Sequence, residues 1–276
     1  MEEYLLADGY RVPKVGFGTY NIQGNDGVRR FEMALNNGYR LLDSAYNYEN
    51  EGAVGRAVRN SSVPRDQITV ASKLPGRHHE YDAALKAIEE SVLRMGLDYI
   101  DLYLIHWPNP LEDKYVEAWQ ALVDAQKTGL IRSIGLSNFL PEHIDRLEKE
   151  IGVLPVINQV ELHPYFNQAE QRTYHEEKNI ITQSWSPLGR QNASAEEEVI
   201  QRLAEKYGKT PAQIILRWNI ELGLLPIPKS AHASRQAENI AIFDFSLTKE
   251  EVDQINKLTR TNGRNKDQDP RKYQEF

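Results

Sequence analysis

LLDSAYNYENE, from Leu41 to Glu51, is the segment from which the organisation of the chain can be worked out. Its first apolar residues end abruptly at Asp43, Tyr48 follows in a short polar run, and the next residues, AVGRAVR, have helical spacing. This order predicts a buried strand, a polar loop and the start of a helix. In a barrel of alternating strands and helices, the carboxyl ends of the strands carry the chemistry. Asp43 and Tyr48 are therefore candidate site residues.

The composition limits the classes of protein to which the chain can belong. It has 276 residues, a formal net charge of -7 and no cysteine. The negative charge disfavours nucleic acid and anionic membranes as partners, and without cysteine neither disulfides nor thiolate zinc sites can form. The first residues, MEEYLLADGY, lack the features of a signal peptide, and no apolar run approaches the roughly 20 residues of a membrane span. We therefore expect a cytoplasmic protein with no membrane partner and no nucleic-acid partner.

Strand-like and helical patterns alternate along the chain. The strand-like segments cover residues 15–20, 39–43, 67–73, 100–106, 131–137, 156–161, 180–184 and 224–227. Helical spacing covers residues 28–35, 51–59, 82–95, 115–127, 142–148, 168–178, 196–207, 211–220 and 247–258. Regular alternation predicts a parallel sheet, and eight such units without a long linker predict a closed (β/α)8 TIM barrel with extra helices near the C-terminus. Residues 1–276 are expected to form a single barrel domain.

Three segments lie outside this alternation. Asp8-Gly9 stands between short apolar stretches and favours a tight turn, which predicts an N-terminal β-hairpin over residues 4–12. Residues 24–27 are expected to form a polar turn before the first helix of the barrel. Residues 259–276 are polar and aperiodic, so they form either a tail packed over one edge of the barrel or a mobile one.

The ends of three predicted strands, with the loop that follows the first of them, bring together an acid, a phenol, a lysine and a histidine. A free tyrosine has a pKa of about 10, which is high for a proton donor at neutral pH. Lys73 beside Tyr48 would lower that pKa, and Asp43 would keep Lys73 charged and in place. His106 would donate to, or orient, the oxygen that Tyr48 protonates. This set suits the polarisation and protonation of a carbonyl, and the electrons would have to come from a bound hydride donor.

The chain resembles the aldo-keto reductase family along nearly its whole length, in particular the compact bacterial-type group of 2,5-diketogluconate and glyoxal reductases. The resemblance rests on motifs in the same order: GFGTY (16–20), LLDSAYNYENE (41–51), SKL (72–74), LIHWP (104–108), IGLSNF (134–139), NQVELHPY (158–165), SPLG (186–189) and IPKS (227–230) with Arg235, Glu238 and Asn239. It implies that the family's catalytic tetrad is Asp43, Tyr48, Lys73 and His106, without substitution.

The resemblance also implies NADP(H) as cofactor, bound in extended form without a Rossmann fold. This agrees with the absence of a GxGxxG motif between a strand and a helix. The residues that it assigns to the cofactor are Thr19, Asp43, Ser137, Asn138, Gln159, Trp185, Ser186, Leu188, Gly189, Lys229, Ser230, Arg235, Glu238 and Asn239. Trp185 stands where the family more often has tyrosine or phenylalanine. A lysine, a hydroxyl and an arginine suit the adenosine 2′-phosphate, which favours NADPH over NADH.

Tyr20, Tyr46, Trp107 and His106 are expected to line the pocket of a small carbonyl substrate, in a monomeric enzyme that needs no metal. The substrate class is aldehydes, ketones or keto sugars. Each residue alone has a plainer interpretation, such as a loop cap for Asp43, a packing residue for Tyr48 or a core histidine for His106. Two other functions stay open. One is a cofactor-binding regulatory or scaffold subunit on the same barrel. The other is a metal-dependent hydrolase, which the lack of clustered histidines disfavours.

Overall fold

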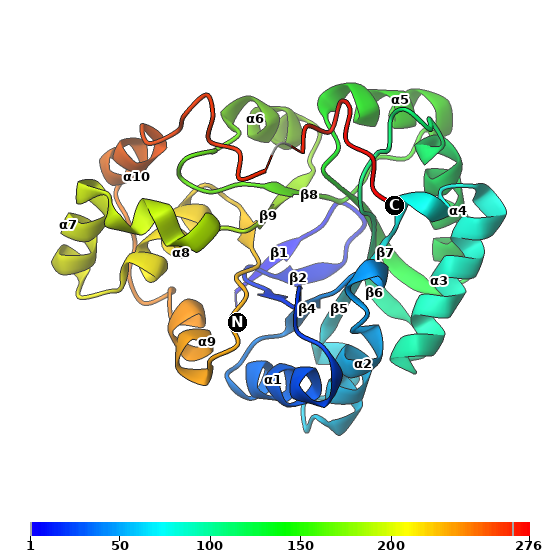
Figure 1. Cartoon of the computed structure of the whole chain (residues 1–276), viewed down its shortest axis with the longest axis horizontal. Coiled ribbons are helices and arrows are strands. Elements are labelled where there is room, and N and C mark those ends of the chain that lie inside the picture. Colours follow the sequence, from blue (N-terminus) through cyan, green and yellow to red (C-terminus); the bar gives the residue numbers. More distant parts are fainter. Residues whose placement is uncertain (1, 267) are drawn as a thin grey trace.

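The computed structural model describes residues 2–266 and 268–276, apart from the side chains of residues 190–192. Its central sheet has eight parallel strands in the order β10-β9-β8-β7-β6-β5-β4-β3 (Figure 1). The strands are β3 (Phe17–Gly18), β4 (Leu41–Asp43), β5 (Thr69–Leu74), β6 (Ile100–Ile105), β7 (Ile131–Ser137), β8 (Ile157–Glu161), β9 (Ile181–Trp185) and β10 (Leu225–Pro226). Each strand pairs with its neighbour in sequence, as the regular alternation predicts.

Backbone contacts between the first and the last strand close the sheet into a barrel. Gly16 donates from its backbone N–H to Pro226 O at 3.0 Å, and Gly18 donates to Pro228 O at 3.1 Å. These glycines leave room for the closure, because an added Cβ would lie 2.6 Å from Leu41 Cδ2 at position 16 and 2.9 Å from Ile227 O at position 18. The predicted (β/α)8 TIM barrel is confirmed.

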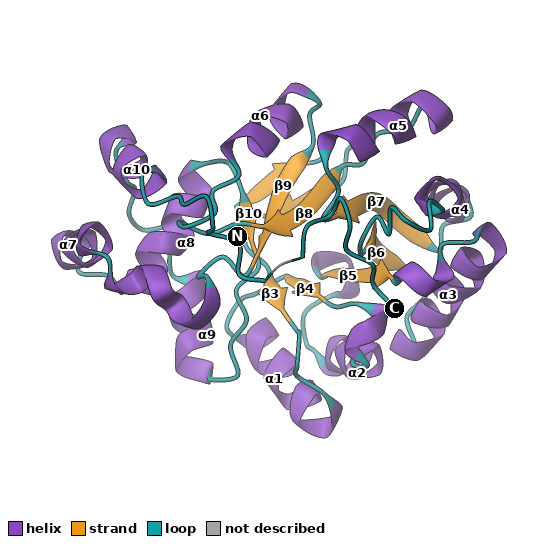
Figure 2. Cartoon of the chain, turned by 45° about the horizontal axis from the view of Figure 1, so that its top comes forward, coloured by secondary structure: helices purple, strands orange, loops and turns teal. Residues whose placement is uncertain are grey.

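Helices form a ring outside the strands (Figure 2). They are α1 (Gly24–Asn36), α2 (Glu51–Asn60), α3 (Tyr81–Met95), α4 (Tyr115–Lys127), α5 (Pro141–Ile151), α6 (Ala169–Glu177), α7 (Glu198–Tyr207), α8 (Pro211–Glu221), α9 (Ala233–Ile240) and α10 (Lys249–Asn256). Short 3-10 turns are η1 (Tyr46–Tyr48), η2 (Arg65–Gln67), η3 (Gly76–His78) and η4 (Arg190–Glu196). The polar turn expected at residues 24–27 is wrong, because these residues are the first turn of α1. Helix α9 was not predicted.

The two ends of the barrel are covered by the two ends of the chain. The strands β1 (Glu3–Leu5) and β2 (Arg11–Pro13) form the predicted antiparallel hairpin. Leu6, which follows β1, and Val12 of β2 pack in one cluster with residues of the barrel strands such as Leu41 and Ile157, so the hairpin plugs that end. The described residues of the tail, 259–266 and 268–276, cross the carboxyl ends of the strands (red in Figure 1). They are therefore packed rather than mobile.

The tail is held by hydrogen bonds along its length. Arg260 N donates to Tyr165 O at 3.0 Å, Asn265 N donates to Glu161 Oε1 at 2.5 Å, and Glu275 N donates to Asn109 Oδ1 at 3.0 Å. Within the described residues, no helix combines the length and apolar character that crossing a bilayer requires.

Candidate active site

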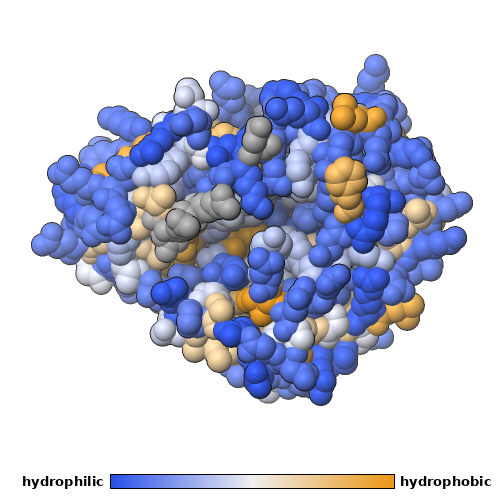
Figure 3. Space-filling view, in the orientation of Figure 1, coloured by the Kyte–Doolittle hydropathy of each residue, from blue (hydrophilic) through white to orange (hydrophobic). Residues whose placement is uncertain are grey.

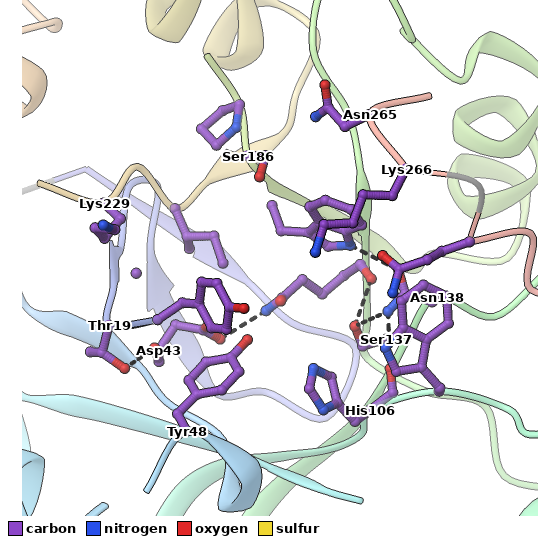
Figure 4. Close-up of a pocket in the computed structure, with 18 of the residues that line it drawn as sticks. Thr19, Asp43, Tyr48, His106, Ser137, Asn138, Ser186, Lys229, Asn265 and Lys266 are labelled. Carbon is purple, nitrogen blue, oxygen red and sulfur yellow. Dashed lines mark hydrogen bonds between the residues drawn. The ribbon is translucent and has the colours of Figure 1, made fainter. Parts of the chain in front are cut away.

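A cavity of about 650 Å³ lies at the carboxyl ends of the strands and opens as a hollow on the face shown in Figure 3. Fourteen predicted residues line it: Thr19, Tyr20, Asp43, Tyr48, His106, Trp107, Ser137, Asn138, Gln159, Trp185, Ser186, Leu188, Gly189 and Lys229. Asp43 at the end of β4, Tyr48 on η1 just after it, and His106 after β6 point into the same space (Figure 4). The barrel thus brings together residues that lie far apart in sequence.

Lys73 lies behind the cavity wall and forms a buried ion pair. Its Nζ donates to Asp43 Oδ2 at 2.7 Å and to Ser44 O at 2.7 Å, and its side chain is 0% exposed. Gln159 Nε2 donates to the other oxygen of Asp43 at 2.8 Å. Burial lowers the pKa of the Lys73 ammonium, while Asp43 opposes that shift. The pair is therefore satisfied on both sides, as a buried charge requires.

The expectation that Lys73 lowers the pKa of Tyr48 is not met. Lys73 Nζ lies 4.9 Å from the centre of the Tyr48 ring, and among the described residues it donates to Asp43 and Ser44 rather than to the phenol. Burial first, and then the carboxylates of Asp43 and Glu275, raise the pKa of Tyr48 well above its ordinary value. The phenol accordingly keeps its proton at neutral pH.

His106 stands between Tyr48 and the C-terminal tail. Its ring packs edge-on against the Tyr48 ring, with the centroids 5.7 Å apart. Its Nδ1 lies 2.7 Å from Glu275 Oε1. The other ring nitrogen, Nε2, is thus the one left for a ligand in the cavity. Glu275 was not singled out in the sequence, because it belongs to a polar segment without periodicity.

A hydrogen-bond network joins the ends of β7, β8 and β9. Asn138 Nδ2 donates to Ser137 Oγ at 3.0 Å, and Trp185 Nε1 donates to Asn138 Oδ1 at 2.8 Å. Ser137 Oγ in turn donates to Gln159 O at 3.0 Å. These hydrogen bonds hold the side chains of Ser137, Asn138 and Trp185 in place. The cavity wall therefore has a hydroxyl and an amide group at fixed positions beside the flat indole of Trp185. Such a wall suits a planar ring that carries a carboxamide.

A second cavity, of about 400 Å³, adjoins the first and shares Leu188 and Lys229 with it. The remaining predicted cofactor residues line it: Ser230, Arg235, Glu238 and Asn239. Lys229 and Arg235 bring two positive charges to this cavity, and the start of α9 adds backbone N–H groups. The donor set fits a phosphate, so the two cavities together have the chemistry of a track for a phosphorylated dinucleotide.

Of the residues expected in the substrate pocket, Tyr20, Trp107 and His106 line the cavity and Tyr46 does not. Tyr46 does not line the cavity, because its hydroxyl accepts from Arg94 Nη2 at 2.8 Å and its ring stacks on the Arg94 guanidinium, 3.9 Å away. Spacing alone could not separate Tyr46 from Tyr48. They lie on one 3-10 turn, but Tyr46 packs against Arg94 and Tyr48 lines the cavity.

The tail adds residues that the sequence did not reveal as part of the site. Asn265, Lys266, Gln268, Tyr273 and Glu275 line the first cavity, as does Asn47. The ring of Tyr273 packs on Trp107 with the centroids 4.4 Å apart. Lys266 reaches in from the side opposite Tyr48 (Figure 4). The only sequence signal was an aromatic residue and an acid in an otherwise polar terminus.

Comparison with known proteins agrees with this geometry. The profile of the Aldo/keto reductase family matches residues 14–260. The chain is 51% identical to 2,5-diketo-D-gluconic acid reductase B of Corynebacterium sp. (strain SHS752001) over 271 residues, which are 98% of this chain and 97% of that protein. It is 44% identical to methylglyoxal reductase DkgA of Escherichia coli (strain K12) over 254 residues, which are 92% of each protein.

Solved structures resemble the chain to a similar extent. A mutant of Gox0644 in complex with NADPH has a TM-score of 0.93 and 39% identity, covering 98% of this chain and 97% of that chain. An aldo-keto reductase of Bombyx mori in complex with NADP has a TM-score of 0.91 and 35% identity, covering 99% of this chain and 98% of that chain. The likeness thus extends over the barrel and the cavities at its mouth.

Proposed function

The chain belongs to the aldo/keto reductase family, and from this we propose that it reduces aldehyde or ketone carbonyls to alcohols with NADPH as hydride donor. The observation that carries the proposal is the meeting of Asp43, Tyr48 and His106, backed by Lys73, in a cavity that continues into a second, cationic one. A carbonyl reductase needs a proton donor, a means of holding the carbonyl and a bound source of hydride. The first cavity offers a proton donor and groups that can hold the carbonyl. The two cavities together offer a binding site for the hydride donor.

The residues of both cavities fit NADPH, which supplies the hydride when bound. Ser137, Asn138 and Gln159 would hold the carboxamide, and the indole of Trp185 would stack on the nicotinamide. Ser186, Leu188 and Gly189 would follow the pyrophosphate. Lys229, Ser230 and Arg235 would bind the 2′-phosphate, with Glu238 and Asn239 near the adenine. Thr19 and Asp43 would complete the wall on the nicotinamide side.

Tyr48 acts as the general acid in this proposal. Its raised pKa keeps the phenol protonated at neutral pH, and the oxygen of a carbonyl that accepts hydride becomes an alkoxide, a stronger base than phenolate. Proton transfer from Tyr48 Oη to that oxygen is therefore favourable. Lys73, 4.9 Å from the ring centre, offsets part of the charge on the phenolate that remains, although burial and the carboxylates of Asp43 and Glu275 keep the pKa of Tyr48 raised overall. Asp43 keeps Lys73 charged, and His106 donates to the carbonyl oxygen and orients it.

The substrate class is small dicarbonyls and keto sugar acids. Two relatives are named for 2,5-diketo-D-gluconic acid and methylglyoxal. The cavity is lined by the aromatic side chains of Tyr20, Trp107 and Tyr273 and by Lys266. Aromatic walls suit a short carbon chain, and a lysine in the lining suits a substrate that carries a carboxylate.

The test is NADPH consumption by the purified protein with a panel that includes methylglyoxal, 2,5-diketo-D-gluconate and an unsubstituted aliphatic aldehyde. We expect turnover with NADPH, weaker turnover with NADH, and no sensitivity to chelators. Tight NADPH binding without turnover on any member of the panel would replace the enzyme with a cofactor-binding regulatory subunit. Activity that chelators abolish would instead support a metal-dependent reaction.

A further inference from the structure

The penultimate residue of the chain reaches the histidine of the site. The Glu275 side chain is 10% exposed, although it is one residue from the terminus. Its backbone is held from both sides by Asn109, which donates to Glu275 O at 2.7 Å and accepts from Glu275 N at 3.0 Å. Gly76 passes so close that an added Cβ would lie 2.6 Å from Glu275 O. The end of the tail is thus built into the barrel mouth.

Every contact of the Glu275 carboxylate is with a donor group. Oε1 accepts from Asn47 Nδ2 at 2.8 Å and lies 2.7 Å from His106 Nδ1, and Oε2 accepts from Gly76 N at 3.2 Å. The contact with His106 is off the line of the ring N–H, so it is an ion-pair contact rather than a linear hydrogen bond. Burial opposes ionisation, but His106, Asn47 and Gly76 together lower the pKa of Glu275. The group is therefore a carboxylate at neutral pH.

The position of this carboxylate restricts the protons on His106. A carboxylate oxygen only accepts, so a proton on the ring nitrogen 2.7 Å away is favoured over a lone pair, which the carboxylate would repel. A neutral imidazole has one N–H, and with that proton on Nδ1 its Nε2 is an acceptor, which repels the oxygen of a carbonyl. For Nε2 to donate to the substrate, the ring must carry both protons.

We propose that Glu275 holds His106 as an imidazolium, so that its Nε2–H is the donor that orients the substrate carbonyl. Glu275 is then a positioning residue that acts through His106. The proposal rests on the proposed function, since it concerns how His106 holds the carbonyl of a substrate. It assigns a chemical role to the tail, which otherwise would only cover the cavity.

The charges around His106 are consistent with this assignment. Tyr48 faces it from η1, and the Asp43–Lys73 pair lies beyond Tyr48 at the ends of β4 and β5. On the side of η3, Arg77 Nη1 donates to Phe276 O at 3.2 Å, and burial lowers the pKa of the neighbouring His79 to about 4, so that ring is neutral. Glu275 is thus the carboxylate in direct contact with His106 among the described residues.

The first test detects the protons on the two ring nitrogens of His106 by NMR. In full-length protein saturated with NADPH and labelled with ¹⁵N-histidine, the His106 signals are identified by their loss in His106→Asn. We expect both nitrogens of His106 to be protonated at neutral pH, and the ring of Glu275→Gln to be neutral. A neutral His106 with its proton on Nε2 in the wild-type protein would overturn the proposal, because Nδ1 would then face the carboxylate without a proton.

The second test separates action through His106 from mere anchoring of the tail. Glutamine at position 275 has nearly the same shape as glutamate. Its side chain has one acceptor oxygen instead of two, whereas Asn47, Gly76 and His106 all contact the carboxylate. We expect Glu275→Gln to lower kcat by roughly 10-fold or more without changing NADPH affinity. In a His106→Ala background, the same change should alter kcat by less than about 2-fold, because the group through which it acts is gone.

The matched control is Glu142→Gln, which removes the contact between Glu142 and Arg271 of the same tail, 3.4 Å apart and away from the cavity. It should leave kcat unchanged. An equal effect of Glu275→Gln with and without His106 would mean that the residue only anchors the tail, and would overturn the proposal. Failure of the proposed function is distinguishable, because the wild-type protein would then show no turnover on any member of the substrate panel.

Discussion

Tyr48 is surrounded by groups that oppose the loss of its proton. Burial and the carboxylates of Asp43 and Glu275 raise its pKa, whereas the ammonium of Lys73 is engaged by Asp43 and Ser44. In the proposed role, the phenol would be protonated at neutral pH and would give up its proton when an alkoxide, a stronger base, forms beside it.

Arg235 provides a prediction at the scale of one side chain. It lines the second cavity with Lys229 and Ser230, where the proposal places the 2′-phosphate. Replacing it with alanine should weaken NADPH binding by roughly 10- to 100-fold, the value of one hydrogen bond to a charged group, and change NADH binding little. Titration with both nucleotides measures this. Lys127→Ala on α4, where the side chain is 68% exposed, is the control. Equal losses for NADPH and NADH would contradict the phosphate assignment.

His79 provides a prediction about pH and stability. Burial lowers its pKa to about 4, whereas in the unfolded chain it titrates at about 6.5. Between these values the unfolded state binds more protons than the folded state, so the free energy of unfolding decreases as the pH falls. From pH 7.5 to 5.5 this one group should remove on the order of 1 kcal/mol.

Urea unfolding at the two pH values measures this loss. Neither ring nitrogen of His79 has a hydrogen-bond partner among the described residues, so His79→Leu should cost little at pH 7.5 and make the stability less dependent on pH. An unchanged pH dependence in the variant would show that other groups, such as His175, account for the acid sensitivity. Burial likewise lowers the pKa of His175, to about 3.

At the scale of elements, the barrel strands and most helices could be predicted from apolar periodicity. Helix α9 and the packed tail could not, because polar contacts hold them in place. Strand β7 and helix α4 lie where their patterns predict, because each buries an apolar face. Helix α9 was missed because Gln236 and Asn239 are the residues that it buries, and these leave no apolar stripe in the sequence. The tail is held by backbone and carboxylate hydrogen bonds, which have no periodicity either. The same reasoning explains why Glu275 could not be foreseen.

Helix α2 provides a prediction at this scale. Gly55 faces the end of α3, where an added Cβ would lie 1.8 Å from Met95 O. Gly55→Ala should therefore destabilise the protein by about 1–3 kcal/mol or more, since the backbones of two helices must separate. Gly52→Ala in the same helix is the control, because its Cβ would be 3.3 Å from Arg94 O and alanine favours the helix. Equal stability of the two variants in urea would contradict the close-packing argument.

At the scale of the whole molecule, the two cavities lie at one end of the closed barrel and the N-terminal hairpin covers the other end. The N-terminal hairpin packs on the starts of the strands, and the tail crosses their carboxyl ends. Two adjoining cavities then run from the cationic pocket beside α9 to the space between Tyr48 and His106. The sequence of the first 258 residues suffices to predict the proposed tetrad and cofactor residues. The last 18 residues contribute further lining residues to the first cavity, which the sequence did not predict.

The central claim is that this molecule reduces a carbonyl with Tyr48 as the proton donor. The most direct test is the rate of NADPH consumption by Tyr48→Phe with methylglyoxal, measured beside the NADPH dissociation constant of the same protein. The ring is kept and only the hydroxyl is removed, so we expect the rate to fall by about 10²- to 10⁴-fold while the affinity for NADPH stays within about 2-fold of the wild type. A rate close to that of the wild type would contradict the account.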